Sequence, residues 1–218
     1  MDIEIIETND GSHTLFSKQF NEIYHSRHGA VAESQHIFIE AGLNCLHKKE
    51  IKVFELGFGT GLNALLAWIY AETKGIKIGY DSIELYPVPM ELISKVNYAE
   101  LLGDRDKFLR LHECAWDEIS ELSPHFSLVK FHESMLEMPY PYSCMDIVFF
   151  DAFSPEKQPE MWTTEVFQKM YDILVPGGIL VTYCSKSYVR RNMQEVGFEI
   201  AKIPGPHGKR DMVRATKK

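Results

Sequence analysis

The sequence is poor in the residue patterns that build disulfide frameworks and metal sites. Its 218 residues include four cysteines, and no two are spaced as Cys-x-x-Cys. We therefore expect reduced thiols rather than a disulfide framework or a zinc site. The nine histidines contain no His-Glu-x-x-His pattern. Solvated or hydrogen-bonded histidines are the expected outcome, and we predict no metal cofactor.

Signals for membrane insertion and export are also missing. No apolar run has the length needed to cross a bilayer, so no membrane partner is expected. The first residues, Met1-Asp2-Ile3-Glu4, are acidic where a signal peptide is basic. A hydrophobic fraction of 45% and a charged fraction of 25% are ordinary for a globular protein. Together with the reduced thiols, these features predict a cytoplasmic protein.

The charge is unevenly distributed along the chain. A formal net charge of -8 argues against extensive non-specific binding to nucleic acid. The segment Lys202–Lys218 nevertheless has six basic residues and one acid, and Arg190-Arg191 lies upstream. Charge alone favours a solvated basic tail. The alternative is a basic rim beside a site that meets a phosphate backbone.

The first fifty residues differ in pattern from the rest. Ile3–Thr8 alternates as a strand does, and Asn9-Asp10-Gly11-Ser12 is a turn signal before a second short strand near His13–Phe16. A helix is expected at roughly Val31–Glu40. We interpret residues 1–50 as an N-terminal strand-turn-strand and helix extension, packed on a main domain of residues 51–218.

From residue 51 onward, strand patterns alternate with helix patterns. The expected strands are Ile51–Leu56, Lys77–Glu84, Phe126–Phe131, Met145–Phe150 and Ile179–Tyr183. The expected helices are one that begins at Leu62, then Pro89–Tyr98, Trp162–Leu174 and Ser187–Val196. Two final strands, Phe198–Ile203 and Asp211–Ala215, follow one another directly. This order predicts an α/β fold with a doubly wound, mostly parallel, Rossmann-like sheet and an antiparallel edge.

The loop from Glu55 to Gly61 has the sequence Glu-Leu-Gly-Phe-Gly-Thr-Gly, between a strand and a helix. Glycines let the backbone turn sharply and let a ligand approach it, and the helix that follows directs its free N–H groups at that ligand. A dinucleotide fingerprint would be spaced G-x-G-x-x-G. The G-x-G-x-G spacing and Glu55 favour S-adenosylmethionine, whose ammonium suits Glu55 and whose carboxylate suits the helix end.

Three more carboxylates follow predicted strands. Glu84 ends the second strand, where it can accept hydrogen bonds from both hydroxyls of a ribose. Glu133 follows the third strand; it either receives an adenine amino group or is a surface residue. Asp151 follows the apolar strand Met145–Phe150, at the end where ligands meet catalytic groups in open α/β sheets. We favour catalysis over the alternative that Asp151 caps the next turn.

Four segments carry a family resemblance: Glu55–Asn63, Asp151–Trp162, Tyr188–Phe198 and Gly208–Met212. They resemble the methyltransferase half of the bifunctional bacterial enzymes that make 5-methylaminomethyl-2-thiouridine in tRNA. The resemblance implies a class I S-adenosylmethionine-dependent methyltransferase that methylates the aminomethyl group of the wobble uridine in the anticodon loop. The sequence ends at Lys218 without the family's flavin-dependent half. We therefore expect a stand-alone methyltransferase and a separate enzyme that supplies the aminomethyluridine.

The resemblance also assigns site residues. Asp151 is implied to face the substrate amine as the catalytic residue. Cofactor contacts are implied for Glu33, Glu55, Gly57, Phe58, Gly59, Thr60, Gly61, Asn63, Glu84 and Glu133. Phe153 and Trp162 are candidates to stack on the flipped uracil, with core packing an equal alternative for Trp162. Candidates for tRNA phosphate contacts are Arg190, Arg191, Lys209 and Arg210.

Four other functions compete with this interpretation. An aminopropyltransferase resembling spermidine synthase shares the fold and sets an aspartate against an amine, and a methyltransferase of small-molecule amines needs the same site. A Rossmann oxidoreductase is disfavoured by the glycine spacing. A non-enzymatic tRNA-binding module is disfavoured by the acidic net charge and by the intact cofactor loop.

Overall fold

The computed structural model describes residues 3–139, 143–206 and 210–218. Its centre is an eight-stranded sheet in the order β10-β11-β9-β8-β4-β5-β7-β6. The strands of this sheet are β4 (Glu50–Leu56), β5 (Lys77–Ile83), β6 (Ser120–Ser123), β7 (Phe126–Phe131), β8 (Met145–Phe150), β9 (Leu174–Thr182), β10 (Glu199–Pro204) and β11 (Asp211–Thr216). Strands β4, β5, β7, β8 and β9 pair in parallel, and β6, β10 and β11 pair antiparallel to their neighbours.

The connections between these strands define where a ligand can bind. The chain runs outward from β4 through β5 to β7, then returns to β8 on the other side of β4. Loops that leave β4 and β8 therefore diverge and open a crevice at the carboxyl ends of the two strands. The predicted doubly wound, mostly parallel sheet with an antiparallel edge is confirmed.

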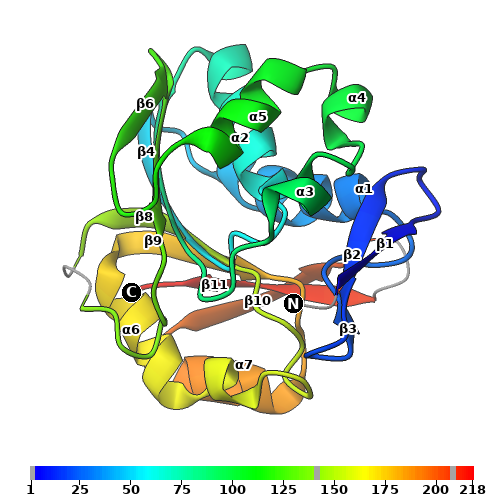
Figure 1. Cartoon of the computed structure of the whole chain (residues 1–218). Helices are drawn as coiled ribbons and strands as arrows, with labels where there is room; N and C mark the ends of the chain where they lie inside the picture. The colour runs from blue at the N-terminus through cyan, green and yellow to red at the C-terminus, as the bar shows by residue number, and fades with distance from the viewer. Residues whose placement is uncertain (1–2, 140–142, 207–209) are drawn as a thin grey trace.

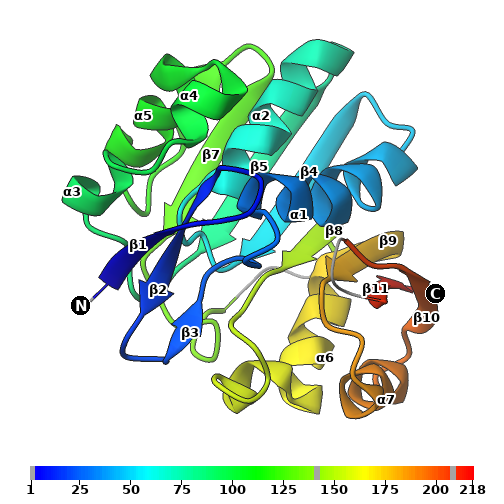
Figure 2. The same cartoon turned by 90° about the vertical axis from the view of Figure 1, so that its right-hand side faces the viewer.

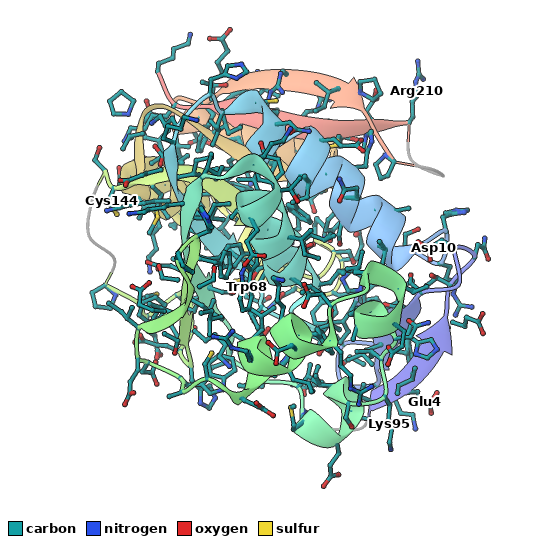
Figure 3. The ribbon with its side chains drawn as sticks, turned by 90° about the horizontal axis from the view of Figure 1, so that it is seen from above. Glu4, Asp10, Trp68, Lys95, Cys144 and Arg210 are labelled. Carbon is teal, nitrogen blue, oxygen red and sulfur yellow. The ribbon has the colours of Figure 1, made fainter. Side chains whose placement is uncertain are left out.

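Helices cover both faces of the sheet (Figure 1). One face carries α1 (Ala30–Ser34), the π-helical η1 (Gln35–Glu40), the 3-10 turn η2 (Leu43–Cys45), α2 (Leu62–Lys74), α3 (Met90–Ile93), α4 (Tyr98–Leu102) and α5 (Arg105–Glu113). The other face carries the 3-10 turn η3 (Pro159–Trp162), α6 (Thr164–Ile173) and α7 (Ser187–Glu195). Figure 3 shows Trp68 of α2 in the interior, where it stacks on Phe126 with ring centroids 5.4 Å apart.

Alternating side chains of the central strands divide the core into two clusters. Val53 of β4 and Phe149 of β8 belong to the cluster under α2, whereas Phe54 and Val148 belong to the cluster under α6. All six residues of β8 are buried. A parallel strand with helices on both faces requires a nearly continuous apolar pattern, and Asp146 is the one polar residue of β8.

A separate three-stranded sheet forms the N-terminal part, with β1 (Ile3–Glu7), β2 (His13–Ser17) and β3 (Glu22–Ile23). It lies beside α1 and α3, next to the carboxyl ends of the parallel strands (Figure 2). Leu15 is fully buried in the core cluster under α2. Asp10, in the turn before β2, accepts the backbone N–H groups of Ser12 (3.0 Å) and Ala32 (3.1 Å). This carboxylate fixes the turn against α1.

The predicted helix Pro89–Tyr98 is wrong. Two short helices, α3 and α4, replace it, with Asn97 between them in a non-helical conformation. The side chain of Asn97 accepts the backbone N–H of His13 (2.8 Å) and donates to the carbonyl of Gly11 (2.8 Å). Docking of the N-terminal sheet therefore interrupts the helix. Strand β3, helix α5 and strand β6 were not predicted, and β9 begins earlier than the expected Ile179.

The described residues contain neither a membrane-spanning helix nor a metal site of the kinds tested. No helix in this part of the chain is long and apolar enough to span a membrane. Within the same described ranges, no group of three or more histidine, cysteine, aspartate or glutamate side chains is arranged to hold a metal ion.

Candidate active site

A cavity of about 430 Å³ lies where β4 and β8 end. Its floor is the glycine loop, and one wall follows the end of β8 from Asp151 to Ser154. The opposite wall combines Glu84, after β5, with Glu133, after β7. Residues 22–28 of the N-terminal part cover it. The cavity therefore occupies the crevice that the strand order defines.

Close backbone approach makes Gly57 necessary at the floor of the cavity. Its φ is +93°, and a Cβ atom added here would lie 2.9 Å from the carbonyl oxygen of Asp151. The backbone N–H of Asp151 also donates to the carbonyl of Leu56 (3.1 Å). Any side chain at residue 57 would separate the glycine loop from the end of β8. This contact holds Asp151 beside the loop.

Asn63, in the first turn of α2, connects two carboxylates. Its side-chain amide donates to Glu55 (3.0 Å) and to Asp151 (2.8 Å). Glu55 also accepts from the hydroxyl of Ser82 (2.7 Å) and is fully buried. Burial, supplemented by the charge of Asp151, raises the pKa of Glu55 to about 8. Glu55 is therefore mostly uncharged at neutral pH, whereas Asp151 is partly exposed and lines the cavity.

Glu84 is fixed by two backbone donors. Its carboxylate accepts from Gly59 (3.1 Å) and from Tyr86 (2.8 Å). Burial raises the pKa of Glu84, and the hydrogen bonds from Tyr86 and Gly59 oppose that rise. The structure thus joins the end of β5 to the glycine loop through this carboxylate, which faces the cavity.

Three acids converge on Tyr183, which follows β9. The hydroxyl of Tyr183 donates to the carbonyl of Ala152 (2.9 Å). Burial, together with the nearby charges of Asp151, Glu22 and Glu33, holds the pKa of Tyr183 well above its usual value. All three acids line the cavity, although they come from the end of β8, from β3 and from α1. This part of the cavity therefore has a concentration of negative charge.

Comparisons with known proteins found a matching protein family and similar bifunctional proteins. Residues 125–218 match a family described as S-adenosyl-L-methionine-dependent methyltransferase. The bifunctional protein MnmC of tRNA 5-methylaminomethyl-2-thiouridine biosynthesis from Cupriavidus metallidurans is 30% identical over 97% of this chain and 33% of that protein. The corresponding protein from Leptospira interrogans is 31% identical over 92% of this chain and 33% of that protein. The chain spans about a third of the length of these curated relatives.

Solved structures agree with the sequence comparisons. MnmC2 from Aquifex aeolicus matches 100% of this chain and 70% of that chain, with a TM-score of 0.75 and 26% identity. The chain carries an S-adenosyl-L-methionine-dependent methyltransferase domain. Spermidine synthase from Thermotoga maritima matches 99% of this chain and 68% of that chain, with a TM-score of 0.63 and 14% identity. That likeness concerns the fold alone.

The cavity of the methyltransferase fits S-adenosylmethionine. The glycine loop leads into the N-terminus of α2, where free N–H groups suit a carboxylate. The half-buried carboxylate of Glu84 suits ribose hydroxyls, and Glu133 lies on the same side of the cavity. Glu55 differs from expectation because it lies behind the cavity wall and is mostly uncharged at neutral pH. The side-chain oxygen of Asn63, which is buried and has no hydrogen-bond partner among the described residues, is an acceptor available there to an ammonium.

The other predicted cofactor residues of the methyltransferase differ in exposure to the cavity. Gly57, Phe58, Gly59 and Thr60 line it, as does Glu33 from α1. The ring of Phe58 is buried against His112 and Trp116. Gly61 lies behind the wall, at the start of α2.

Of the two aromatic candidates, only Phe153 lines the cavity of the methyltransferase. Trp162 is 1% exposed, packs on Phe150 and donates its indole N–H to the carbonyl of Phe153 (2.8 Å). Its ring has no free face for a base, so the structure contradicts stacking by Trp162 and favours core packing. Trp162 instead fixes the backbone of Phe153.

The basic candidates lie on and near α7. Arg191 is exposed, and Arg190 donates its Nε–H to the carbonyl of Ser185 (3.1 Å). Arg210 lines a second hollow of about 310 Å³, which shares Ser154 and Tyr183 with the main cavity. Figure 3 shows Arg210 at the periphery of the molecule. Lys209 lies outside the described residues.

Several cavity residues were not predicted from the sequence. Tyr183 follows β9, so the rule that located Asp151 at a strand end would also have found it. Phe20, Glu22 and Tyr24 come from the β2–β3 hairpin and its surroundings, and no motif marks them. Their place at the cavity results from docking of the N-terminal sheet.

Proposed function

We propose that this protein transfers the methyl group of S-adenosylmethionine to the amine of 5-aminomethyluridine, with or without a 2-thio group, at the wobble position of tRNA. The observation that carries the proposal is the position of Asp151. It lies at the end of β8, is held by Asn63, and faces a cavity that contains the glycine loop and Glu84. Similarity to MnmC proteins over nearly the whole chain supports the same substrate class.

Different residues are proposed to bind the cofactor and the substrate amine. The glycine loop and Glu84 would hold the cofactor, with Glu133 on the adenine side. When bound there, S-adenosylmethionine supplies an electrophilic methyl group on a sulfonium. Asp151 would orient the amine towards that group. The three acids near Tyr183 suit a substrate that arrives as a cation and a product that remains one.

Proton balance limits what Asp151 can do. An alkylamine is mostly protonated near neutral pH and must lose a proton before its nitrogen can attack. A facing carboxylate favours the protonated amine, so Asp151 does not lower the amine pKa. Its proposed role is to accept a hydrogen bond from the amine, direct the lone pair and stabilise the cationic product.

The basic groups on α7 and near β11 are proposed to meet the tRNA backbone. Phosphate contacts supply affinity, whereas contacts in the cavity select the nucleoside. Arg191 is exposed, and Arg210 lies beside the hollow that adjoins the cavity. A tRNA substrate would place the protein in the cytoplasm, and a separate enzyme would supply the aminomethyluridine.

Aminopropyl transfer is the second candidate, because spermidine synthase shares the fold. The two reactions use different donors, so a paired assay separates them. tRNA that carries 5-aminomethyluridine would be incubated with S-adenosylmethionine or with its decarboxylated form. Methyl transfer from the first donor alone is the expected result. Aminopropyl transfer from the second, without methylation, would refute the proposal. Methylation of small amines but not of tRNA would point to a small-molecule substrate.

A further inference from the structure

Three aromatic rings gather at the cavity from three separate segments. Phe20 comes from the β2–β3 hairpin, Tyr86 follows β5, and Phe153 follows β8. The rings of Phe20 and Phe153 are stacked, with centroids 4.7 Å apart and an interplanar angle of 29°. The ring of Tyr86 lies 5.8 Å from that of Phe20, tilted by 58°. All three residues line the cavity.

These rings do not belong to the packed interior of the protein. Neither of the two core clusters of the described residues includes Phe20, Tyr86 or Phe153. Tyr86 is 37% exposed, and its neighbour Leu85 is 42% exposed. Aromatic residues usually bury their large apolar area in a core. Phe153 also meets the ring of Tyr24 edge to face, with centroids 5.0 Å apart, so the part of the three rings that lines the cavity is what a flat partner can contact.

Hydrogen bonds hold the three segments in place. The hydroxyl of Ser154 donates to Glu22 (2.7 Å), which ties the hairpin to the loop after β8. The backbone N–H of Tyr86 donates to Glu84 (2.8 Å). The carbonyl of Phe153 accepts from Trp162 (2.8 Å). The aromatic surface is therefore preorganised, which reduces the entropy lost when a ligand binds.

We propose that Phe20, Tyr86 and Phe153 form the surface on which the pyrimidine ring of the substrate stacks. The inference rests on the proposed function and adds the residues that select a nucleobase. Stacking on aromatic rings is the usual way in which proteins hold an unstacked base. Phe153 is two residues from Asp151 and both line the cavity, so a base on this surface would lie beside the carboxylate that is proposed to meet its 5-substituent. Two of the three residues come from outside the segments that carry the family resemblance.

The test compares variants that remove a ring with variants that keep it. Phe20→Leu and Tyr86→Leu retain apolar character without a π face, whereas Phe20→Tyr and Tyr86→Phe retain the ring. The matched control is Ile119→Ala, which shortens a side chain that is 74% exposed and does not line the cavity. The substrate is an anticodon stem–loop that carries 5-aminomethyluridine. Three quantities are measured: KM for the stem–loop, kcat, and the calorimetric Kd for S-adenosylmethionine.

Each leucine variant is expected to raise KM for the stem–loop about tenfold, within the range for the removal of one stacking interaction. The cofactor Kd should change less than about twofold, since the variants leave the proposed cofactor contacts intact. Phe20→Tyr and Tyr86→Phe, which keep a π face, should raise KM less than the matching leucine variants, and Ile119→Ala should stay close to the wild type. An unchanged KM in both leucine variants would overturn the inference. A raised cofactor Kd with an unchanged KM would also overturn it, because the rings would then contact the cofactor and not the base.

A binding measurement separates this inference from the proposed function. Affinity for the stem–loop is measured by titration in the presence of S-adenosylhomocysteine, so no turnover is needed. If the wild type binds the stem–loop without methylating it, the proposed function fails. The stacking inference then still predicts about tenfold weaker binding for the leucine variants. If the stem–loop is methylated and these variants bind it normally, the stacking inference alone fails.

Discussion

Asn63 links two carboxylates that have different surroundings. Glu55 is fully buried beneath the glycine loop, and Asp151 is partly exposed at the cavity wall. One amide donates to both. The buried acid therefore helps to hold the amide that positions the exposed one. Because their surroundings differ, Asp151 is tested through turnover and Glu55 through the pH dependence of stability.

The first prediction concerns Asp151. We expect Asp151→Ala to lower turnover on the order of 10²-fold or more, because the variant has no positioned acceptor for the amine hydrogen. The cofactor Kd should change little, since the glycine loop and Glu84 remain. Steady-state kinetics and calorimetry measure the two quantities. Near-normal turnover in this variant would remove Asp151 from the mechanism.

The second prediction concerns the pH dependence of stability at Glu55. Its pKa rises from 4.5 to about 8 on folding. A raised acid pKa contributes stability that is complete below pH 4.5 and is lost as the pH rises towards 8. Glu55→Gln cannot ionise, so we expect it to flatten the fall in stability over that interval, on the order of a few kcal/mol.

Urea unfolding of wild type and Glu55→Gln at pH values near both ends of that interval tests the idea. Ser82 and Asn63 keep a polar partner in the variant, because glutamine has nearly the same shape as protonated glutamate. Burial also raises the pKa of Glu84, and this contribution remains in both proteins. The same pH dependence in both proteins would show that Glu55 ionises normally.

Among the elements, the strands were the easiest to predict. The nearly continuous apolar run of β8 follows directly from burial on both faces, and β4 is buried from Val53 to Leu56. Helix α5 was missed because only Phe108 and Leu111 among its nine residues are buried, which leaves a weak apolar stripe. The helix expected at Pro89–Tyr98 failed because Asn97 bonds to the N-terminal sheet. Contacts of this kind join residues far apart in the chain, so the local sequence pattern does not predict them.

The same limit applies to the site. Residues at the ends of parallel strands, such as Glu84 and Asp151, were predicted because topology brings those ends together. Glu22 and Phe20 were not, since their position depends on how a separate sheet docks. For Glu55 the sequence predicts a direct contact with the cofactor. In the structure Glu55 is fully buried and does not line the cavity.

The third prediction compares two glycines with positive φ. Gly57→Ala would place a Cβ atom 2.9 Å from the carbonyl oxygen of Asp151, whereas Gly75→Ala meets no atom within 4 Å. Both variants bear the cost of a left-handed alanine, about 1 kcal/mol. We expect only Gly57→Ala to weaken cofactor binding as well, by roughly tenfold or more, because the backbone that positions the cofactor is displaced.

Calorimetric titration with S-adenosylmethionine and thermal unfolding distinguish the two effects. Gly75→Ala serves as the control for backbone strain, because it lies at the end of α2 away from the cavity. Equal cofactor affinity in the two variants would mean that the contact between the glycine loop and Asp151 is not needed for binding.

On the scale of the whole molecule, the proposed function requires an acidic protein to approach an anionic substrate. The formal net charge is -8. The basic residues proposed to meet RNA are on α7 and beside β11. Helix α5 lies on the opposite side of the sheet from α7 (Figure 1). Binding should therefore depend on where the charges are and not on their sum.

The fourth prediction tests this placement. We expect Arg190→Gln combined with Arg191→Gln to weaken tRNA binding and to reduce the slope of log Kd against log salt concentration by about one to two, one for each phosphate that the variant no longer neutralises. Arg105→Gln on α5, whose partner is Glu100, is the control. Filter binding over a salt series measures the slope. An unchanged slope in the double variant would leave both arginines without a role in RNA binding.

The central claim is methyl transfer to the aminomethyl group of a tRNA nucleoside. The most direct measurement is nucleoside mass spectrometry of tRNA that carries aminomethyl wobble uridines, after incubation with the protein and S-adenosylmethionine. We expect this nucleoside to gain one methyl group and Asp151→Ala to abolish most of the gain. An unmodified nucleoside, with cofactor binding verified by calorimetry, would contradict the claim.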